Sequence, residues 1–195
     1  MMGQGQSCGL KLSDVGSVRG GRTLFAGLSL ALVPGDAALV TGPNGIGKSS
    51  LLRTIAGLLP AQGKIERTGR LALADENCAL DPELPLAQAL AFWARLDAGD
   101  ETRVNDALAA LGINHLGGIP VRILSTGQRK RAVLARTIAS AADIWLLDEP
   151  TNGLDATAIP LLEAAIAAHR SGGGIIVAAT HQGLAMPGAL SVGLA

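Results

Sequence analysis

The sequence predicts an α/β protein whose mostly parallel core sheet is covered by helices on both faces. Three short runs, "AALVT", "IWLLD" and "IIVAAT", are almost entirely apolar, which is typical of strands buried in a parallel sheet. Longer segments with apolar residues at three- and four-residue steps lie between such runs and predict the covering helices. The chain has 195 residues, of which 48% are hydrophobic, so we expect a single domain with a sizeable core.

Charge and cysteine content exclude several classes of protein. Lys and Arg total 16, as do Asp and Glu, so no global positive charge favours a nucleic-acid partner. Cys8 and Cys78 stand apart from each other, without metal-ligand spacing. This pattern indicates a reducing compartment instead of a disulfide framework or a structural zinc site.

Neither end of the chain is predicted to enter a membrane. The segment "MMGQGQSCGLKL" lacks the basic start and the apolar run of a secretory signal. Residues 171–195 contain no Asp, Glu, Lys or Arg and are long enough to span a bilayer, but several glycines, His181 and Pro187 interrupt them. We therefore interpret this segment as a buried strand, a turn and a final short strand.

The first third of the chain is predicted to be mainly β-structure, and we expect this N-terminal portion to be antiparallel. "LKLSD" and "LSLAL" read as strands bounded by the turns "RGGR" and "PGD". "AALVT" then leads through a glycine-rich loop into "KSSLLRTIAGLL", a predicted helix that ends at Pro60. "KIER" and "RLALA" are predicted as the next strands.

The middle of the chain is predicted to be helical. "LPLAQALAFWARL" and "TRVNDALAALG" have helical periodicity, and Asp100 is placed to cap the second of them. We expect residues 77–124 to form a helical subdomain inserted into a core made of residues 1–76 and 125–195. A helix around Leu161 to His169 separates the last two buried strands.

The motif "GPNGIGKS" fits G-x-x-x-x-G-K-[ST] between a predicted strand and a predicted helix. In such a loop the backbone amides surround phosphate oxygens, Lys48 reaches the β- and γ-phosphates, and the Ser49 hydroxyl binds Mg²⁺. The alternative is a glycine-rich turn without a ligand. The predicted nucleotide-binding residues of this segment are Gly42, Pro43, Asn44, Gly45, Ile46, Gly47, Lys48, Ser49 and Ser50.

Two carboxylates and a histidine follow buried strands. Asp148 and Glu149 end "IWLLDE", at the strand edge where ligands meet open α/β sheets. One carboxylate can hold a metal while its neighbour deprotonates a water molecule; a plain strand end in solvent is the alternative. His181 follows "IIVAAT" and can hydrogen-bond a γ-phosphate or its attacking water, whereas His115 and His169 are interpreted as structural.

A second helix N-terminus is predicted to meet an anion. Ser125 caps a helix whose first turns contain Arg129, Lys130 and Arg131, although cations there oppose the helix dipole. The amides after Ser125 suit a phosphate. Because the three cations cannot all face one phosphate at helical spacing, some are expected to pair with nearby acids.

Asp155 is open to two interpretations. It can cap a following helix, but Pro160 lies five positions later and would disrupt a helix that began there. We therefore predict a helix start nearer Thr157, which leaves Asp155 free for another role.

The motifs "GPNGIGKS", "LSTGQ", "LLDEP", "GLD" and "TH" occur in the order found in ABC ATPases, and the chain resembles that family over nearly its whole length. The resemblance implies an ABC-type P-loop NTPase fold, ATP and Mg²⁺ as cofactors, and two copies that sandwich two ATP molecules. The resemblance implies that Lys48 binds the phosphates and that Ser49 and Asp148 bind Mg²⁺. It implies that Glu149 is the general base and His181 the switch histidine. It also implies that Ser125, Gly127 and Gln128 contact the other copy's ATP and that Asp155 lies at the dimer seam.

Two positions depart from the family pattern. The aromatic residue that usually stacks on adenine is replaced by Arg19, whose guanidinium can also stack on a purine. The Gln that usually links ATP to the helical subdomain is replaced by Glu76, or by Asn77 if the alignment shifts by one residue. A carboxylate there can bind Mg²⁺ but adds negative charge beside the phosphates.

Within the family, the chain is most similar to the CcmA group, the ATPases of cytochrome c maturation. The similar features are "RGGRTLFAGLSLAL", the non-glycine third residue of "LSTGQ", and "HRSGGGIIVAATHQGLAMPGAL". The resemblance implies haem handling, release of a haem chaperone, a CcmB-like integral membrane partner, and a peripheral place on the cytoplasmic face of the bacterial inner membrane. The alternatives are the ATPase of another small transporter, a soluble assembly ATPase, and a P-loop kinase, which "LSTGQ" and Glu149 disfavour.

Overall fold

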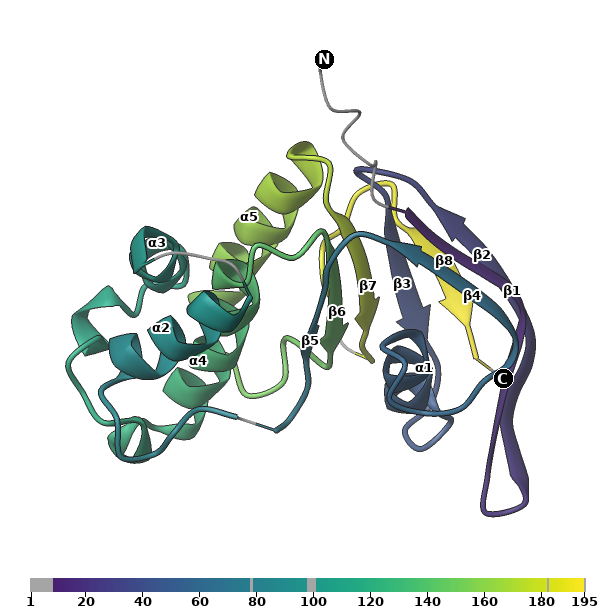
Figure 1. The fold of residues 1–195 in the computed structure, drawn as a ribbon, viewed down its shortest axis with the longest axis horizontal. Coiled ribbons are helices and arrows are strands. Elements are labelled where there is room, and N and C mark those ends of the chain that lie inside the picture. Colours follow the sequence, from purple (N-terminus) through teal and green to yellow (C-terminus); the bar gives the residue numbers. More distant parts are fainter. Residues whose placement is uncertain (1–8, 78, 98–100, 182, 195) are drawn as a thin grey trace.

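The computed structural model describes residues 9–77, 79–97, 101–181 and 183–194, which form two sheets and a group of helices (Figure 1). A five-stranded sheet has the order β5-β6-β7-β3-β8, and a three-stranded sheet has the order β2-β1-β4. Every pairing in the larger sheet is parallel and every pairing in the smaller sheet is antiparallel. The predicted α/β class and its antiparallel N-terminal portion are therefore confirmed.

The antiparallel sheet is built from β1 (Gly9–Arg19), β2 (Arg22–Leu32) and β4 (Gln62–Thr68). Gly20 and Gly21, with φ of 57° and 77°, form the tight turn between β1 and β2. A two-residue hairpin needs positive φ at both turn positions, which glycine adopts without strain. The turn places Arg19 directly opposite Arg22 at the tip of the hairpin.

The parallel sheet is built from β3 (Ala37–Thr41), β5 (Leu71–Ala74), β6 (Ile144–Asp148), β7 (Ile175–Ala179) and β8 (Leu190–Gly193). Every residue of β6 and β7 is buried, because each strand has neighbours on both sides and cover on both faces. β7 and β8 confirm the interpretation of the C-terminal segment as strand, turn and strand. None of the described helices is long and apolar enough to cross a membrane.

Apolar side chains from the two faces of the parallel sheet form two core clusters. Leu146 and Val177 pack with α1 (Lys48–Ile55) and the antiparallel sheet, whereas Trp145 and Ile176 pack with the remaining helices. His169 lies flat against Trp145 in the second cluster, with ring centroids 3.8 Å apart. His115 is exposed in a short 3-10 turn. The packing of His169 agrees with its structural interpretation, whereas the exposed position of His115 does not test that interpretation.

The predicted end of α1 is wrong. The helix ends at Ile55, well before Pro60. Gly57 has a φ of 79°, its amide donates to the carbonyl of Thr54, and the Leu58 amide donates to that of Arg53 at 2.9 Å. A left-handed glycine that closes the last turn in this way ends the helix before the proline is reached.

The helices that follow β5 lie together on one side of the parallel sheet, at the left of Figure 1. They are α2 (Leu86–Leu96), α3 (Glu101–Ala110), the 3-10 turns η1 (Asn114–Leu116) and η2 (Val121–Ile123), and α4 (Thr126–Ala139). Their buried side chains are continuous with those of the sheet and of α5 (Ala158–Ser171). The two predicted helices are confirmed, the proposed cap Asp100 lies outside the described residues, and the subdomain boundaries stay a prediction.

Candidate active site

The C-terminal ends of β3, β7 and β6 lie next to each other, and the predicted phosphate loop, histidine and acidic pair follow these three strands. Residues of the loop, Glu149 and His181 line a pocket of about 400 Å³, whereas Asp148 is not part of its lining. The predicted residues in its lining are Arg19, Asn44, Gly45, Gly47, Lys48, Ser49, Ser50, Glu76, Glu149 and His181. Leu24 and Asn152 also line it; neither was predicted as a site residue, because a leucine and an asparagine outside the phosphate loop carry no signal for nucleotide chemistry.

The phosphate loop requires its glycines. Gly42, Gly45 and Gly47 have φ of 149°, 79° and 117°, a region that favours glycine. A Cβ atom on Gly42 would lie 2.8 Å from the carbonyl oxygen of Leu194, so a side chain has no room there. Gly47 precedes α1 without a side-chain cap, which leaves the first amides of the helix available for phosphate oxygens.

Lys48 is buried, with 6% of its surface exposed. Its ammonium donates to the carbonyl oxygens of Gly42 at 2.8 Å and Pro43 at 3.4 Å. The same group lies 3.6 Å from the Glu149 carboxylate. Gly42, Pro43 and Ile46 are not part of the pocket lining, so the first two act by holding Lys48, and Ile46 packs against the core.

Asp148 has the environment of a metal-binding carboxylate. It is buried, the nearby Ser49 hydroxyl lowers its pKa, and its Oδ1 atom has no hydrogen-bond partner among the described residues. Burial and the neighbouring Glu149 raise its pKa, which Ser49 and Arg53 partly offset. An unpaired buried carboxylate oxygen beside a hydroxyl fits Mg²⁺, a hard cation that prefers oxygen ligands.

Glu149 and His181 form a direct pair. The Glu149 carboxylate lies 2.9 Å from the ring Nδ1 of His181 and 3.3 Å from its backbone nitrogen. Burial raises the pKa of Glu149, but hydrogen bonds and charge from His181, together with Lys48, outweigh this and hold the pKa below its usual range. Glu149 is therefore a carboxylate at neutral pH, as a general base must be.

The backbone of Glu149 is in the left-handed region, with a φ of 44°. Its amide donates to the carbonyl of Ala179, the last residue of β7, at 2.8 Å. Strained backbone of this kind costs about 1–3 kcal/mol and is concentrated at functional sites. No pattern in the sequence predicted the left-handed backbone conformation of Glu149.

The structure places Glu76 in the pocket and Asn77 outside its lining. Asn77 instead hydrogen-bonds the Asp75 side chain through its backbone and its amide group. Of the two residues that were candidates for the position of the family's Gln, Glu76 is therefore the one that lines the pocket. Arg19 and the apolar Leu24 line the same pocket.

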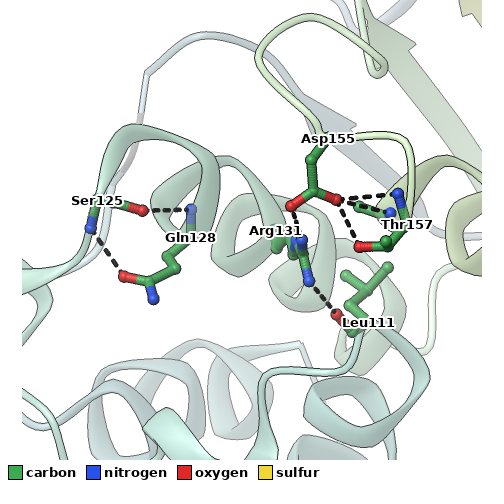
Figure 2. Close-up of polar contacts among 7 residues, drawn as sticks. Leu111, Ser125, Gln128, Arg131, Asp155 and Thr157 are labelled. Atoms are coloured by element: carbon green, nitrogen blue, oxygen red, sulfur yellow. Dashed lines mark hydrogen bonds and ion pairs between the residues drawn. The ribbon is translucent and has the colours of Figure 1, made fainter.

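Ser125 caps α4, as predicted (Figure 2). Its hydroxyl accepts from the Gln128 amide at 3.3 Å, while the Gln128 side chain accepts from the Ser125 amide at 2.9 Å. Neither residue lines the nucleotide pocket of its own chain, nor does Gly127. A Cβ atom on Gly127 would lie 3.2 Å from the carbonyl oxygen of Gly153, so a side chain at this position would be tightly packed.

The three cations that follow Ser125 contact different partners, as their helical spacing predicted. Arg129 donates to the carbonyl of Leu124, and Lys130 donates to that of Asp148. Arg131 forms an ion pair with an acid (Figure 2).

That acid is Asp155. The prediction that Asp155 does not cap a helix is wrong. Its Oδ1 atom accepts from the amides of Thr157 at 3.2 Å and Ala158 at 2.9 Å, and from the Thr157 hydroxyl at 2.7 Å. The helix starts at Ala158, as the proline suggested, because Pro160 is tolerated in the first turn. An aspartate two or three residues before these amides still reaches them, so it caps the helix and also binds Arg131 (Figure 2).

Comparisons with known proteins agree with the site geometry. The family profile of ABC transporters matches residues 25–152. A Sphingopyxis alaskensis protein named cytochrome c biogenesis ATP-binding export protein CcmA is 55% identical over 91% of this chain and 92% of its own length. The Zymomonas mobilis protein of the same name is 56% identical over 91% of this chain and 80% of its own length.

A solved structure from Pyrococcus furiosus, described as an ABC transporter ATP-binding protein, has the same fold. It covers 95% of this chain and 97% of its own, with a TM-score of 0.85 at 22% identity. The family profile and the curated relatives confirm the resemblance to ABC ATPases. With a matching profile over most of its length and relatives above 50% identity, this chain belongs to the ATP-hydrolysing subunits of the ABC transporter family, in their CcmA group.

Proposed function

We propose that this chain is the ATP-hydrolysing subunit of a membrane ABC complex of cytochrome c maturation, which acts in haem handling and in release of the haem chaperone. The observation that carries the proposal is one pocket in which Lys48, Glu149 and His181 meet, in a chain more than half identical to CcmA proteins. A pocket with a phosphate-binding lysine and a general base is suited to ATP hydrolysis.

We infer the following roles for the residues of one chain. Lys48 and the first amides of α1 bind the β- and γ-phosphates. Ser49 and Asp148 would hold Mg²⁺, which supplies charge neutralisation on the phosphates when bound. Glu149 accepts a proton from water as the water oxygen bonds to the γ-phosphorus and the bond to the ADP oxygen breaks. His181 holds the Glu149 carboxylate in place.

The proposal includes a dimer of two copies around two ATP molecules. Ser125, Gly127 and Gln128 lie outside the pocket of their own chain, while the helix that Ser125 caps has an N-terminus suited to phosphate. In the dimer, these residues contact the γ-phosphate of the ATP held by the other copy. We infer that Asp155, at the start of α5, lies at the seam between the copies.

A membrane partner is the second part of the proposal. The CcmA relatives are named as export proteins of cytochrome c biogenesis. We infer that this chain sits peripherally on the cytoplasmic face of the bacterial inner membrane, bound to a CcmB-like integral subunit. Co-expression with such a subunit, followed by affinity purification in detergent, should recover the polytopic protein at a fixed ratio; recovery of soluble partners alone would favour the assembly-ATPase alternative.

Lys48→Ala is expected to weaken nucleotide binding by about tenfold or more, because the hydrogen bonds of a charged group to phosphate are lost. Titration with a fluorescent ATP analogue measures the change. Lys64→Ala, which removes an exposed lysine paired with Glu66 on β4, is the matched control and should bind normally. Normal binding by Lys48→Ala would remove Lys48 from the phosphate site.

A further inference from the structure

Lys130 connects the helix that begins at Ser125 to the acidic strand end. It lies in the first half of α4, and its side chain is half-buried. The ammonium group donates to the backbone carbonyl of Asp148 at 3.4 Å. Because Asp148 is the last residue of β6, this bond holds α4 against the strand that supplies both carboxylates of the site.

The Lys130 ammonium lies in the field of several acids. Burial lowers the pKa of Lys130 below its ordinary value, and four carboxylates partly offset this by favouring the charged form: Asp148, Glu76, Glu149 and Asp75. These acids come from two strand ends, β5 and β6, that are neighbours in the parallel sheet. Lys130 therefore introduces a positive charge where two acidic segments meet.

Other cations already serve two of these four carboxylates. Arg53 pairs with Asp75 at 3.3 Å, and Lys48 pairs with Glu149 at 3.6 Å. Arg53 also lowers the pKa of Asp148, so Glu76 is the carboxylate left for Lys130, and the two residues line one groove of about 390 Å³.

Glu76 links that groove to the nucleotide pocket, because it lines both. Its side chain is exposed, so its negative charge stands at the pocket wall. A carboxylate there opposes the binding of a triphosphate, and a nearby ammonium reduces the opposition.

We propose that Lys130 is a positioning residue whose charge offsets Glu76 beside the bound triphosphate, while its bond to Asp148 keeps α4 against the end of β6. This inference concerns nucleotide binding by a single chain. It is therefore independent of the membrane partner and of haem.

A double-mutant cycle tests the proposal. The purified wild-type chain, Lys130→Gln, Glu76→Gln and the double variant are titrated with N-methylanthraniloyl-ATP in EDTA, so that no metal contributes. Lys130→Gln should weaken binding about three- to tenfold when Glu76 is present, and by about twofold or less when it is Gln. Equal weakening in both backgrounds, or no weakening beside Glu76, overturns the proposal.

Two further variants separate charge from structure. Lys130→Arg keeps the charge and should restore wild-type affinity, and Lys64→Gln, the same change on exposed β4, should have no effect. Glu76 is exposed, so Glu76→Gln will fold. It removes the negative charge at the pocket wall and should therefore tighten binding by about two- to fivefold. Unchanged or weaker binding by Glu76→Gln would contradict the proposal even if Lys130→Gln proved unstable.

Discussion

Glu149→Gln is expected to slow ATP hydrolysis by about a hundredfold or more, the usual range for loss of a general base, while nucleotide binding is kept. The amide has nearly the same shape as the carboxylate but cannot accept a proton from water. Lys48 and the start of α1 still hold the phosphates. Phosphate release at saturating ATP measures the turnover, and titration with a fluorescent ATP analogue measures the affinity.

Glu66→Gln is the matched control for this variant, because Glu66 is an exposed glutamate on β4 whose partner is Lys64. It should hydrolyse ATP at the wild-type rate. The pairing with His181 makes the assignment of Glu149 specific, since it holds the pKa of that carboxylate low and the group ionised. Turnover by Glu149→Gln within a few-fold of wild type would show that another group removes the proton.

Ser125→Arg is expected to abolish the ATP-dependent dimer while each single chain still binds nucleotide. Ser125 is exposed at the N-terminus of α4 and lies outside its own chain's nucleotide pocket. A large side chain there fills the space that the other copy's γ-phosphate needs. The measurement is molar mass by light scattering after size exclusion with ATP, in the Glu149→Gln background so that ATP persists.

Two variants control for other effects of Ser125→Arg. Ser125→Ala removes the cap, at a cost of about 1 kcal/mol, and the hydroxyl contact to the other copy's ATP, but it adds no bulk and should still dimerise at saturating ATP. Ser171→Arg adds the same side chain at the exposed end of α5 and should dimerise as the parent does. A normal ATP-dependent dimer of Ser125→Arg would remove Ser125 from the interface and refute the sandwich arrangement.

The phosphate loop and the buried strands could be predicted because their signals are local. "GPNGIGKS" spans one strand-to-helix turn, and the glycines within it are required by the positive φ at Gly42, Gly45 and Gly47. The apolar runs of β6 and β7 mark strands that are buried along their whole length. The end of α1 was missed because a left-handed glycine stops a helix before a proline does, and both signals were present.

The features that were predicted wrongly, or not predicted at all, depend on contacts between segments that are distant in the sequence. Asp155 was expected to be free, yet its carboxylate binds Arg131 of α4 and the first amides of α5. Lys130 was grouped with its neighbours as a candidate for phosphate or for an acid. Its actual contact is the backbone of β6, 18 residues away in the chain. Helical spacing indicates which direction a side chain takes but not what lies in that direction.

The sequence by itself determined the fold class, the order of the motifs, and the kinds of group available for nucleotide chemistry. These follow from short patterns whose physical meaning is local: periodicity, glycine conformation and helix caps. The tertiary structure decided which groups meet, because the order β6-β7-β3 brings three strand ends together that are far apart in the chain. In the folded chain Glu149 contacts His181, and Glu76 lines the pocket whereas Asn77 does not. Lys130 lies near four carboxylates. Charges interact through space, so their partners depend on sheet order and packing.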